Sequence, residues 1–391
     1  MVIRKIENIM VISGNIVTPE TAAWGEVKIQ NDLISEVDLS DNIHPCADWI
    51  LPGFIDVHLH GIGYGDATPQ SVHLMAEQAP RYGLTSLCPT MASDAPEVML
   101  AFVKRVRELI QNPITGAAKL PGSHLEGPFI DYAHRGGMNE DFVRGVDMDE
   151  LQQLLDAADG TLKIMTLSPE LENSACAIKL LTQHRCRVSM GHTGMPPEGV
   201  DDFVRAGGSA VCHLFDTFDG RYVDNGVSQV SLSDAVLVDD RLFIELIADG
   251  VHVPPALLKL AIRAAGVKRI VGITDSLCGS GLPDGAYPMT DAGRSFTLKN
   301  GDCCRLTDHP EVIVGSCLTQ NQAFYNLVER WGFTPVEAAM MTASNAAGYL
   351  GIADRTGAIR PGLAADIVVL AGDRKSVKQT WIDGKLSYEA N

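Results

Sequence analysis

Two histidines at the end of a short apolar segment have the residue type and spacing of metal ligands. The segment Phe54–Gly61 opens with apolar and β-branched residues, which is typical of a buried strand. Side chains alternate in direction along a strand, so His58 and His60 project to the same side. Two imidazoles on one side could form half of a metal site, although two ordinary strand histidines would show the same pattern. The positions of the other His, Asp and Glu residues therefore decide between these interpretations.

Later apolar segments also end in histidine or carboxylate residues. Four His and one Glu can converge on one or two divalent metal ions, and a further Asp can accept a proton from the water that attacks the substrate. Each residue alone has an ordinary alternative: a helix cap for Glu126 or Asp275, a core or surface position for the histidines. Their joint placement favours a metal-dependent hydrolase. The residues are Glu126 in His124–Phe129, His192 after Gly191, His213 after Cys212, Asp249 and His252 in Ala248–His252, and Asp275 after Thr274.

Apolar segments that alternate with helix-like segments must position these side chains. Val98–Ile110 and Ala175–His184 carry apolar residues at helical spacing, and Pro254-Pro255 opens another helix, where proline is tolerated. Strands alternating with helices predict an α/β fold, and eight such units predict a (β/α)₈ TIM-like barrel, whose functional residues lie at the C-terminal strand ends. The eight predicted strands are Phe54–His60, Leu84–Thr90, Leu120–Glu126, Leu162–Ser168, Arg187–His192, Ser209–Leu214, Phe243–Asp249 and Arg269–Asp275.

The two ends of the chain have a different pattern from the middle. Short apolar runs alternate with turn signals in residues 9–50, and the C-terminal residues show the same pattern. We expect both ends to combine into one small β-sandwich domain, made of residues 1–50 and 361–391, with the barrel of residues 51–360 inserted between them. Within the barrel, Asp284–Val314 is rich in Gly, Asp and Thr and predicts an inserted hairpin or flap, and Thr319–Trp331 predicts a final helix.

The amino-acid composition limits the classes of protein to which the chain can belong. The chain has 391 residues, of which 46% are hydrophobic and 20% charged, as in a globular protein. Its formal net charge of −18 argues against partners such as nucleic acid or an anionic membrane surface. We see neither a signal peptide nor an apolar run of transmembrane length. Nine scattered cysteines without a C-x-x-C motif fit free thiols in a reducing compartment, so we expect a cytoplasmic protein.

Several motifs together resemble the amidohydrolase superfamily, and within it the family of N-acetylglucosamine-6-phosphate deacetylases. The H-x-H pair and the terminal Asp of the last strand are shared across the superfamily, whereas H-L-E-G-P-F and A-D-G-x-H are more specific to the deacetylases. The resemblance covers nearly the whole chain. The motifs that carry it are Leu51–Gly61, His124–Phe129, Gly191–Thr193, Ala248–His252, Thr274-Asp275, Gly315–Thr319 and Gly357–Asp366.

The resemblance implies a role for each matching residue. Glu126, His192 and His213 would hold a principal divalent metal, expected to be zinc, with iron(II) or another divalent ion as alternatives. His58 and His60 would complete a second site, which some family members lack. Asp275 would accept the proton of the attacking water and deliver it to the leaving amine.

Two further residues are assigned to the substrate by the same resemblance. His252 would contact the sugar or its phosphate. Arg221, in Gly220-Arg221, would reach the phosphate of the substrate bound to the neighbouring subunit, and this implies a homodimer.

Two departures from the family pattern concern substrate contacts. Gly136-Gly137-Met138 replaces a motif that ends in a polar residue, so the thioether of Met138 stands where a side chain helps to hold the substrate, and nearby His134 is a candidate substitute. Asp216 and Thr217 replace an Asn-Ala pair that contacts the phosphate. A carboxylate at Asp216 would repel a phosphate dianion unless it were paired, for example with Arg221.

The expected activity is metal-dependent hydrolysis of a linear amide, the acetamide of N-acetylglucosamine-6-phosphate, which gives glucosamine-6-phosphate and acetate. One alternative is another N-acyl substrate, such as N-acetylgalactosamine-6-phosphate, an unphosphorylated amino sugar or an N-acyl amino acid. The other alternative is a barrel without catalytic activity that acts as a binding protein. Retention of all five candidate ligands and of Asp275 argues against it.

Overall fold

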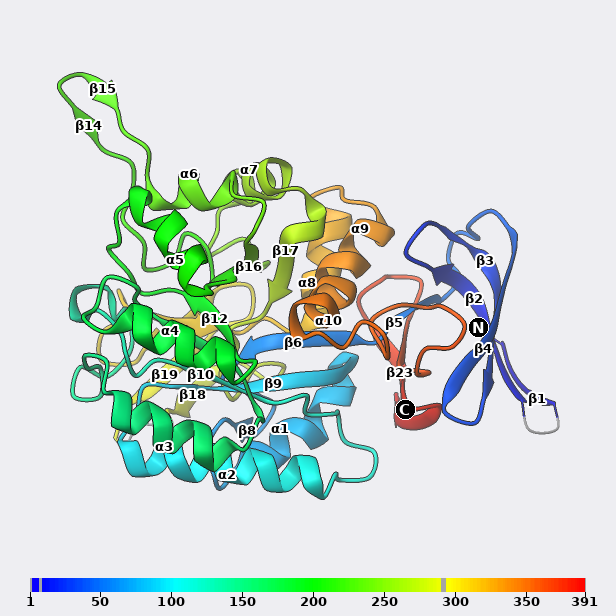
Figure 1. Ribbon diagram of the computed structural model, residues 1–391. Coiled ribbons are helices and arrows are strands. Elements are labelled where there is room, and N and C mark those ends of the chain that lie inside the picture. Colours follow the sequence, from blue (N-terminus) through cyan, green and yellow to red (C-terminus); the bar gives the residue numbers. More distant parts are fainter. Residues whose placement is uncertain (1, 7–8, 290–292, 391) are drawn as a thin grey trace.

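Eight parallel strands form the centre of the molecule in the computed structural model, which describes residues 2–6, 9–289 and 293–390 (Figure 1). Each strand lies within or overlaps one of the eight segments predicted from the sequence, in the predicted order around the sheet. The strands are β6 (Phe54–Leu59), β9 (Leu84–Ala92), β10 (Ser123–Glu126), β11 (Leu162–Leu167), β12 (Arg187–Met190), β13 (Ala210–Val211), β16 (Phe243–Ile247) and β17 (Ile270–Ile273).

The first and last of these strands meet at their C-terminal ends. The backbone N–H of His60 donates to the carbonyl of Ser276 at 2.8 Å, and the N–H of Asp275 donates to the carbonyl of His58 at 2.9 Å. These bonds bring the end of the sheet back to its beginning. The predicted (β/α)₈ barrel is therefore confirmed, and its C-terminal ends carry the residues singled out in the sequence.

Helices cover the outside of the barrel because each buries an apolar stripe against the strands. In α2, for example, Met99, Phe102, Val103 and Val106 follow helical spacing and are all fully buried. The α-helices are α1 (Val72–Gln78), α2 (Pro96–Gln111), α3 (Met148–Ala158), α4 (Ser174–Gln183), α5 (Val200–Ala206), α6 (Leu232–Leu237), α7 (Pro255–Ala265), α8 (Gln320–Tyr325), α9 (Pro335–Ala339) and α10 (Asn345–Leu350), and π-helical turns at Asn326–Arg330 and Met340–Ser344 extend α8 and α9.

Both ends of the chain combine beside the barrel, as expected, and they form one eight-stranded sheet there. Its order is β24-β23-β22-β5-β2-β3-β4, with β1 paired to β2. Ile34 exchanges backbone hydrogen bonds with residues 362 and 363, so the sheet curves round to enclose its own apolar core. The predicted boundaries after residues 50 and 360 stay a prediction. The strands are β1 (Val2–Ile6), β2 (Ile9–Val17), β3 (Ala22–Gln30), β4 (Leu33–Asp41), β5 (Trp49–Pro52), β22 (Ile367–Leu370), β23 (Val377–Ile382) and β24 (Lys385–Glu389).

The segment predicted as an inserted hairpin or flap is a four-stranded antiparallel sheet. It has a small core of its own that includes Phe296, Leu298 and Val314. Two further hairpins leave the barrel, and the one formed by residues 223–228 projects far from the body of the protein (Figure 1). The strands are β18 (Gly285–Pro288), β19 (Ser295–Leu298), β20 (Cys303–Leu306) and β21 (Ile313–Ser316), with hairpins β7 (Gly61–Ile62)–β8 (Gly65–Asp66) and β14 (Val223–Asp224)–β15 (Val227–Ser228).

No helix in the described ranges combines the length and the apolar character needed to span a bilayer.

Candidate metal centre and active site

Four imidazoles surround one buried carboxylate at the C-terminal end of the barrel. Nε2 of His213, His192 and His58 lies 2.8, 3.1 and 3.3 Å from Oε1 of Glu126, and Nε2 of His60 lies 3.2 Å from its Oε2. The five side chains come from β6 and β10 and from the residues that follow β6, β12 and β13. The five metal ligands predicted from the sequence are thus brought together in one place.

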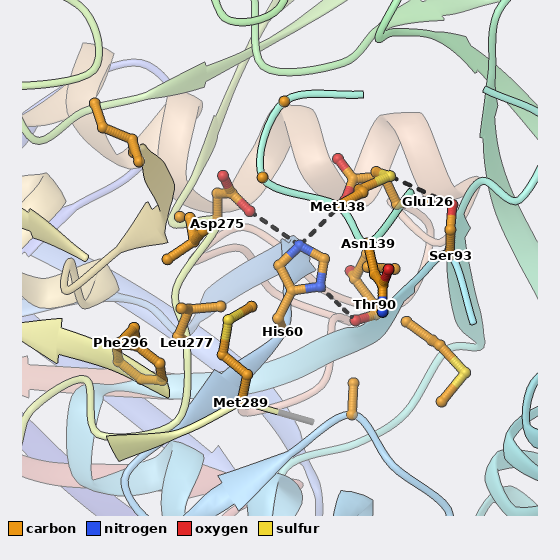
Figure 2. A pocket seen from close by; sticks show the side chains of 18 of the residues that line it. His60, Thr90, Ser93, Glu126, Met138, Asn139, Asp275, Leu277, Met289 and Phe296 are labelled. Atoms are coloured by element: carbon orange, nitrogen blue, oxygen red, sulfur yellow. Dashed lines mark hydrogen bonds and ion pairs between the residues drawn. The ribbon is translucent and has the colours of Figure 1, made fainter. Parts of the chain in front are cut away.

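Asp275 lies on the other side of His60 from Glu126 (Figure 2). Its Oδ1 is 3.1 Å from Nε2 of His60 and 3.5 Å from Nε2 of His58. The residue directly follows β17 and has a φ of 50°, in the left-handed region that aspartate tolerates better than most residues. It caps no helix, because the next α-helix along the chain begins at Gln320.

Glu126 is not a helix cap either. The first helical turn after β10 is the 3₁₀ segment Tyr132–His134, and its N-cap residue is Asp131. Both capping alternatives considered for these carboxylates are therefore wrong.

The hydrogen bonds of the imidazoles show which ring nitrogens are available to a metal. Nδ1 of His60 lies 2.8 Å from the carbonyl oxygen of Thr90, and Nδ1 of His192 lies 3.0 Å from that of His134. A carbonyl oxygen can only accept, so each Nδ1 carries a proton, and in the neutral ring each Nε2 has the lone pair that a metal ion requires. Nε2 of His58 is buried and has no hydrogen-bond partner among the described residues. These donors fit a divalent metal ion such as zinc.

The pKa values of the ionisable groups in the centre also favour a bound cation. Burial raises the pKa of the Glu126 carboxyl, but the neighbouring histidines, His58 foremost, outweigh it and hold the pKa well below its ordinary value. Burial lowers the pKa of His60, but its bonds with Asp275 and Glu126 outweigh it and raise the pKa to about 9. The carboxylates thus stay ionised and require positive charge beside them, which protons on the imidazoles or a divalent cation can supply.

His124 belongs to the same motif as Glu126 but is not available as a ligand. Its Nδ1 lies 3.0 Å from the carbonyl oxygen of Val57, and its Nε2 lies 2.8 Å from the hydroxyl of Thr166. Burial holds the pKa of this imidazole well below its ordinary value. His124 is therefore a neutral packing residue whose ring lies edge-on to that of His58.

Two residues in contact with the centre were missed by the sequence analysis. Oε2 of Glu245, on β16, lies 3.0 Å from Nδ1 of His58. Sγ of Cys212 lies 3.5 Å from the same nitrogen and 3.7 Å from Oε1 of Glu126. A glutamate inside an apolar strand segment is a signal that could have identified Glu245, whereas nothing in the local sequence marks Cys212.

A pocket opens from the centre between the barrel and the inserted sheet, and Figure 2 shows part of its lining. His60 lies near the centre of the view, with Asp275 above it on the left and Glu126 above it on the right. Met138, Asp216 and Thr217, assigned to the substrate from the sequence, also line the pocket. Two regions of the lining were not anticipated: Asp66 and Asp94 near the ends of β8 and β9, and Arg294, Met289 and Phe296 of the inserted sheet.

His252 lies close to the pocket residues. Its Nδ1 is 2.6 Å from Oδ2 of Asp249, and its buried Nε2 has no hydrogen-bond partner in the described ranges. A ligand atom of His252 lies within 4.8 Å of carboxylate oxygens of both Asp216 and Asp275. Its unpartnered nitrogen is therefore placed to contact a polar group of a bound molecule.

His134 and Arg221 lie differently from the other predicted substrate residues. The His134 ring bonds Asp131 at 2.5 Å and lies 3.4 Å from Asp219, while its backbone carbonyl bonds His192. Arg221 is bound through two nitrogens to Asp234, and its side chain is 65% exposed. The Arg221 guanidinium holds the pKa of the Asp234 carboxyl well below its ordinary value.

The pairing of Arg221 with Asp216 suggested from the sequence is therefore wrong within one chain, because Asp234 takes the guanidinium instead.

The sequence of the chain matches one family and several curated proteins. The model of the Amidohydrolase family matches residues 49–387. Among curated relatives, N-acetylgalactosamine-6-phosphate deacetylase of Escherichia coli O157:H7 is 32% identical over 87% of this chain and 88% of its own length. N-acetylglucosamine-6-phosphate deacetylase of Bacillus subtilis (strain 168) is 32% identical over 94% of this chain and 93% of its own length.

Two solved structures are similar along the whole chain. N-acetylglucosamine-6-phosphate deacetylase from Thermotoga maritima has a TM-score of 0.86 and 28% identity, covering 97% of this chain and 100% of its own. A mutant of the enzyme of that name from Mycobacterium smegmatis, in complex with N-acetyl-D-glucosamine-6-phosphate, has a TM-score of 0.87 and 25% identity, covering 97% of this chain and 99% of its own.

Removal of divalent metal is expected to destabilise the folded protein. A ligand that binds only the folded state raises the free energy of unfolding by RT ln(1 + [L]/Kd), which is about 2.7 kcal/mol at a ligand concentration of 100 Kd. Thermal unfolding and elemental analysis before and after chelation, and again after zinc is added back, measure this effect. His192→Gln should lose metal, whereas His309→Gln, which changes an exposed histidine of the inserted sheet, should not. Equal metal content in both variants would contradict the assigned ligands.

Proposed function

This chain belongs to the amidohydrolase family, and we propose that it removes the acetyl group of N-acetylglucosamine-6-phosphate to give glucosamine-6-phosphate and acetate. The observation that carries the proposal is the convergence of four imidazoles and two carboxylates, Glu126 and Asp275, at the mouth of the barrel. Relatives that bear the name of this activity match nearly the whole chain.

The residues that would hold metal are divided into two sets. Glu126, His192 and His213 present one carboxylate and two imidazoles to a principal ion, and His58 and His60 complete a second set with Glu126 between them. A divalent ion, for which zinc suits the nitrogen and oxygen ligands, would act as a Lewis acid toward the acetamide carbonyl and toward water.

Asp275 would transfer the proton. Burial raises the pKa of this carboxyl, but the bond from His60 and the charge of His58 outweigh it and lower the pKa, so Asp275 is ionised and can accept a proton. It lines the pocket in which the substrate would bind. An amine leaves readily only once it is protonated, so Asp275 would then deliver the same proton to the departing nitrogen.

The remaining pocket residues would hold the sugar. His252 has a buried, unpartnered Nε2, and Thr217 lines the pocket with a hydroxyl. Asp216 and Met138 also face the substrate, and Asp216 suits sugar hydroxyls better than a phosphate, because a carboxylate only accepts hydrogen bonds. His134 would act through its backbone carbonyl, which orients His192, rather than through its ring.

Binding of a phosphate group requires positive charge, and few positively charged side chains of this chain line the pocket. Arg294 is the only Lys or Arg among the described residues that line the pocket, and the acids Asp66, Asp94 and Asp216 line it too. We therefore propose a homodimer in which Arg221 reaches the partner's substrate. Next to Arg221, the projecting hairpin exposes Tyr222 and Val223 to 62% and 67%, and exposed apolar side chains of this kind suit a subunit interface.

A second candidate substrate is N-acetylgalactosamine-6-phosphate. The chain is as similar to the Escherichia coli enzyme named for that substrate as to the Bacillus subtilis enzyme, at 32% identity in each case. The two sugars differ only at one hydroxyl, which the carboxylate of Asp216 is suited to contact. An N-acyl amino acid and a barrel that only binds its ligand are the remaining alternatives.

Two further proposals concern the protein as a whole. Residues 51–360 would carry the chemistry, with residues 1–50 and 361–391 as a supporting domain. A cytoplasmic location is supported by the cysteines, since all nine are free thiols.

Acetate release from a panel of substrates tests the proposed function. The panel contains the 6-phosphates of N-acetylglucosamine and N-acetylgalactosamine, unphosphorylated N-acetylglucosamine and an N-acetylated amino acid. Charge-assisted hydrogen bonds to phosphate are worth roughly 1.5–3 kcal/mol, so kcat/KM should be about tenfold to a hundredfold higher with a phosphate than without it. Equal rates with and without phosphate would contradict the phosphorylated class of substrate, and no acetate from any sugar would contradict the activity.

Asp275→Asn preserves the shape of the side chain but cannot accept the proton. We expect kcat to fall by the roughly 10²–10⁴-fold that is typical of general acid–base catalysis, while metal content and KM change little. Steady-state kinetics and elemental analysis of the same preparation provide both readouts. Asp284→Asn, an aspartate of the inserted sheet that bonds Asn300, is the matched control and should keep normal turnover. Turnover of Asp275→Asn within twofold of the wild type would rule out the assigned role.

Arg221→Gln tests the shared site. If Arg221 contacts the partner's phosphate, KM for the phosphorylated sugar should rise roughly tenfold to a hundredfold, and turnover of the unphosphorylated sugar should not change. Arg241→Gln, which breaks another exposed ion pair, should leave both substrates unaffected. Light scattering at assay concentrations gives the oligomeric state. A fully active monomer would contradict the dimer proposal.

A further inference from the structure

Glu245 is an ionisable residue in the interior of the barrel. It lies on β16, has no exposed surface, and is flanked along the strand by the buried residues Ile244 and Leu246. Branched apolar side chains normally fill such a barrel interior, and a buried carboxylate costs free energy unless a partner compensates it. An apolar residue would pack here at lower cost, so the position of this carboxylate calls for a reason.

The partner of Glu245 is the ring of His58. Oε2 of Glu245 lies 3.0 Å from Nδ1 of His58, and both side chains are fully buried. Sγ of Cys212 lies farther from the same nitrogen, at 3.5 Å, and a thiol is a weaker acceptor than a carboxylate. The ring of His124 packs edge-on against His58, with the centroids 4.7 Å apart. These contacts hold the His58 ring in one orientation.

The proton on Nδ1 determines what Nε2 can do. An ionised carboxylate can only accept a hydrogen bond, so Nδ1 of His58 must donate. In the neutral ring, which is the form that binds a metal, Nε2 then has the lone pair. That nitrogen points toward Glu126, at 3.3 Å, and Asp275, at 3.5 Å, and has no hydrogen-bond partner among the described residues. Glu245 thus directs the free nitrogen of His58 into the centre.

His58 differs in this respect from the other imidazoles of the centre. His60 and His192 donate from Nδ1 to neutral backbone carbonyls, and Nδ1 of His213 has no partner in the described ranges. A carboxylate acceptor increases the electron density of the ring more than a carbonyl does, which strengthens the opposite nitrogen as a metal ligand. A stronger metal ligand at His58 is therefore a reason for a charged residue at position 245, despite the free-energy cost of burying its charge.

We propose that Glu245 is a positioning residue of the metal centre, which fixes the tautomer and orientation of His58 and raises its affinity for a divalent cation. The inference rests on the metal centre of the proposed function but not on the identity of the substrate. Oε1 of Glu245 has no partner of its own among the described residues. The carboxylate therefore acts through the ring of His58 alone.

Zinc affinity of the metal-free protein, measured by competition with a chromophoric chelator, tests the proposal. Glu245→Gln keeps the shape of the side chain and removes its charge. Loss of such an outer hydrogen-bonding partner typically costs 10–100-fold in metal affinity, and we expect a loss in that range. Circular dichroism of the metal-free variant and the metal-free wild type is the control for folding, since a purely structural role predicts a loss of folded protein and unchanged zinc affinity in the protein that remains folded.

Asp249→Asn is the matched control. It also removes the charge of a carboxylate that bonds Nδ1 of an imidazole, that of His252, which holds no metal in this assignment. Its zinc affinity should stay within about twofold of the wild type, a change of only a few tenths of a kcal/mol. Unchanged affinity in Glu245→Gln, or an equal loss in Asp249→Asn, would overturn the proposal.

A measurement on the wild type decides the question if Glu245→Gln does not fold. Nitrogen-15 spectra of the zinc-loaded protein, labelled at histidine, report which ring nitrogen of His58 carries the proton. A proton on Nδ1 and a metal on Nε2 support the role of Glu245, and the reverse arrangement refutes it. These zinc measurements use no substrate and are therefore independent of the acetate assay. If the protein binds zinc as described but releases no acetate, only the proposed activity is refuted. A wild type that binds no divalent metal would refute both.

Discussion

The buried negative charge of Glu126 is the constraint on which the rest of the site depends. A carboxylate without exposure to water requires positive charge and hydrogen-bond donors close by. Here four imidazole nitrogens lie within 3.3 Å of its two oxygens. No single element could supply them, because the histidines come from strands at different places around the barrel. Only closure of the sheet brings them to a common point.

Backbone geometry at the strand ends serves the same arrangement. His192 and Asp275 each follow a barrel strand with φ near +50°, and Phe215 and Thr217 also have positive φ values. Such conformations cost free energy for residues other than glycine and persist where the surroundings enforce them. The side chains of His192, Thr217 and Asp275 line the pocket. The hydrogen bonds from the N–H of Asp275 to the carbonyl of His58 and from the N–H of His60 to the carbonyl of Ser276 hold the last of these turns in place.

The end of the pocket proposed to hold the substrate is built differently from the end around Glu126. The metal centre is buried and its contacts are within 3.5 Å, whereas the substrate end is assembled from a loop, the barrel and the inserted sheet. Arg294 of the inserted sheet bonds the carbonyl of Gly137 through both of its terminal nitrogens, at 3.0 Å, and so joins the two sides. Substitutions in these segments can therefore change the substrate end of the pocket without disturbing the histidines around Glu126.

Several features were determined by the sequence alone. The alternation of apolar and helical segments predicted the barrel, because strand and helix periods are local properties of the chain. His58 and His60 were assigned to one side of a strand for the same reason, and the other ligands by their positions at strand ends. Motif similarity then assigned Asp275 its role. All of these inferences used neighbours in the sequence or a pattern repeated along it.

Other features were decided only by the tertiary structure. Glu245 and His58 are separated by 187 residues, and Cys212 and His58 by 154, so no local pattern records that they meet. A pair between Arg221 and Asp216 was one possibility from the sequence, but Asp234 takes the guanidinium instead. Which acceptor holds each Nδ1 proton likewise depends on strands that become neighbours only when the barrel closes. The sequence specifies which groups can react, and the packing of distant strands decides which of them touch, since hydrogen bonds and ion pairs act over only a few ångströms.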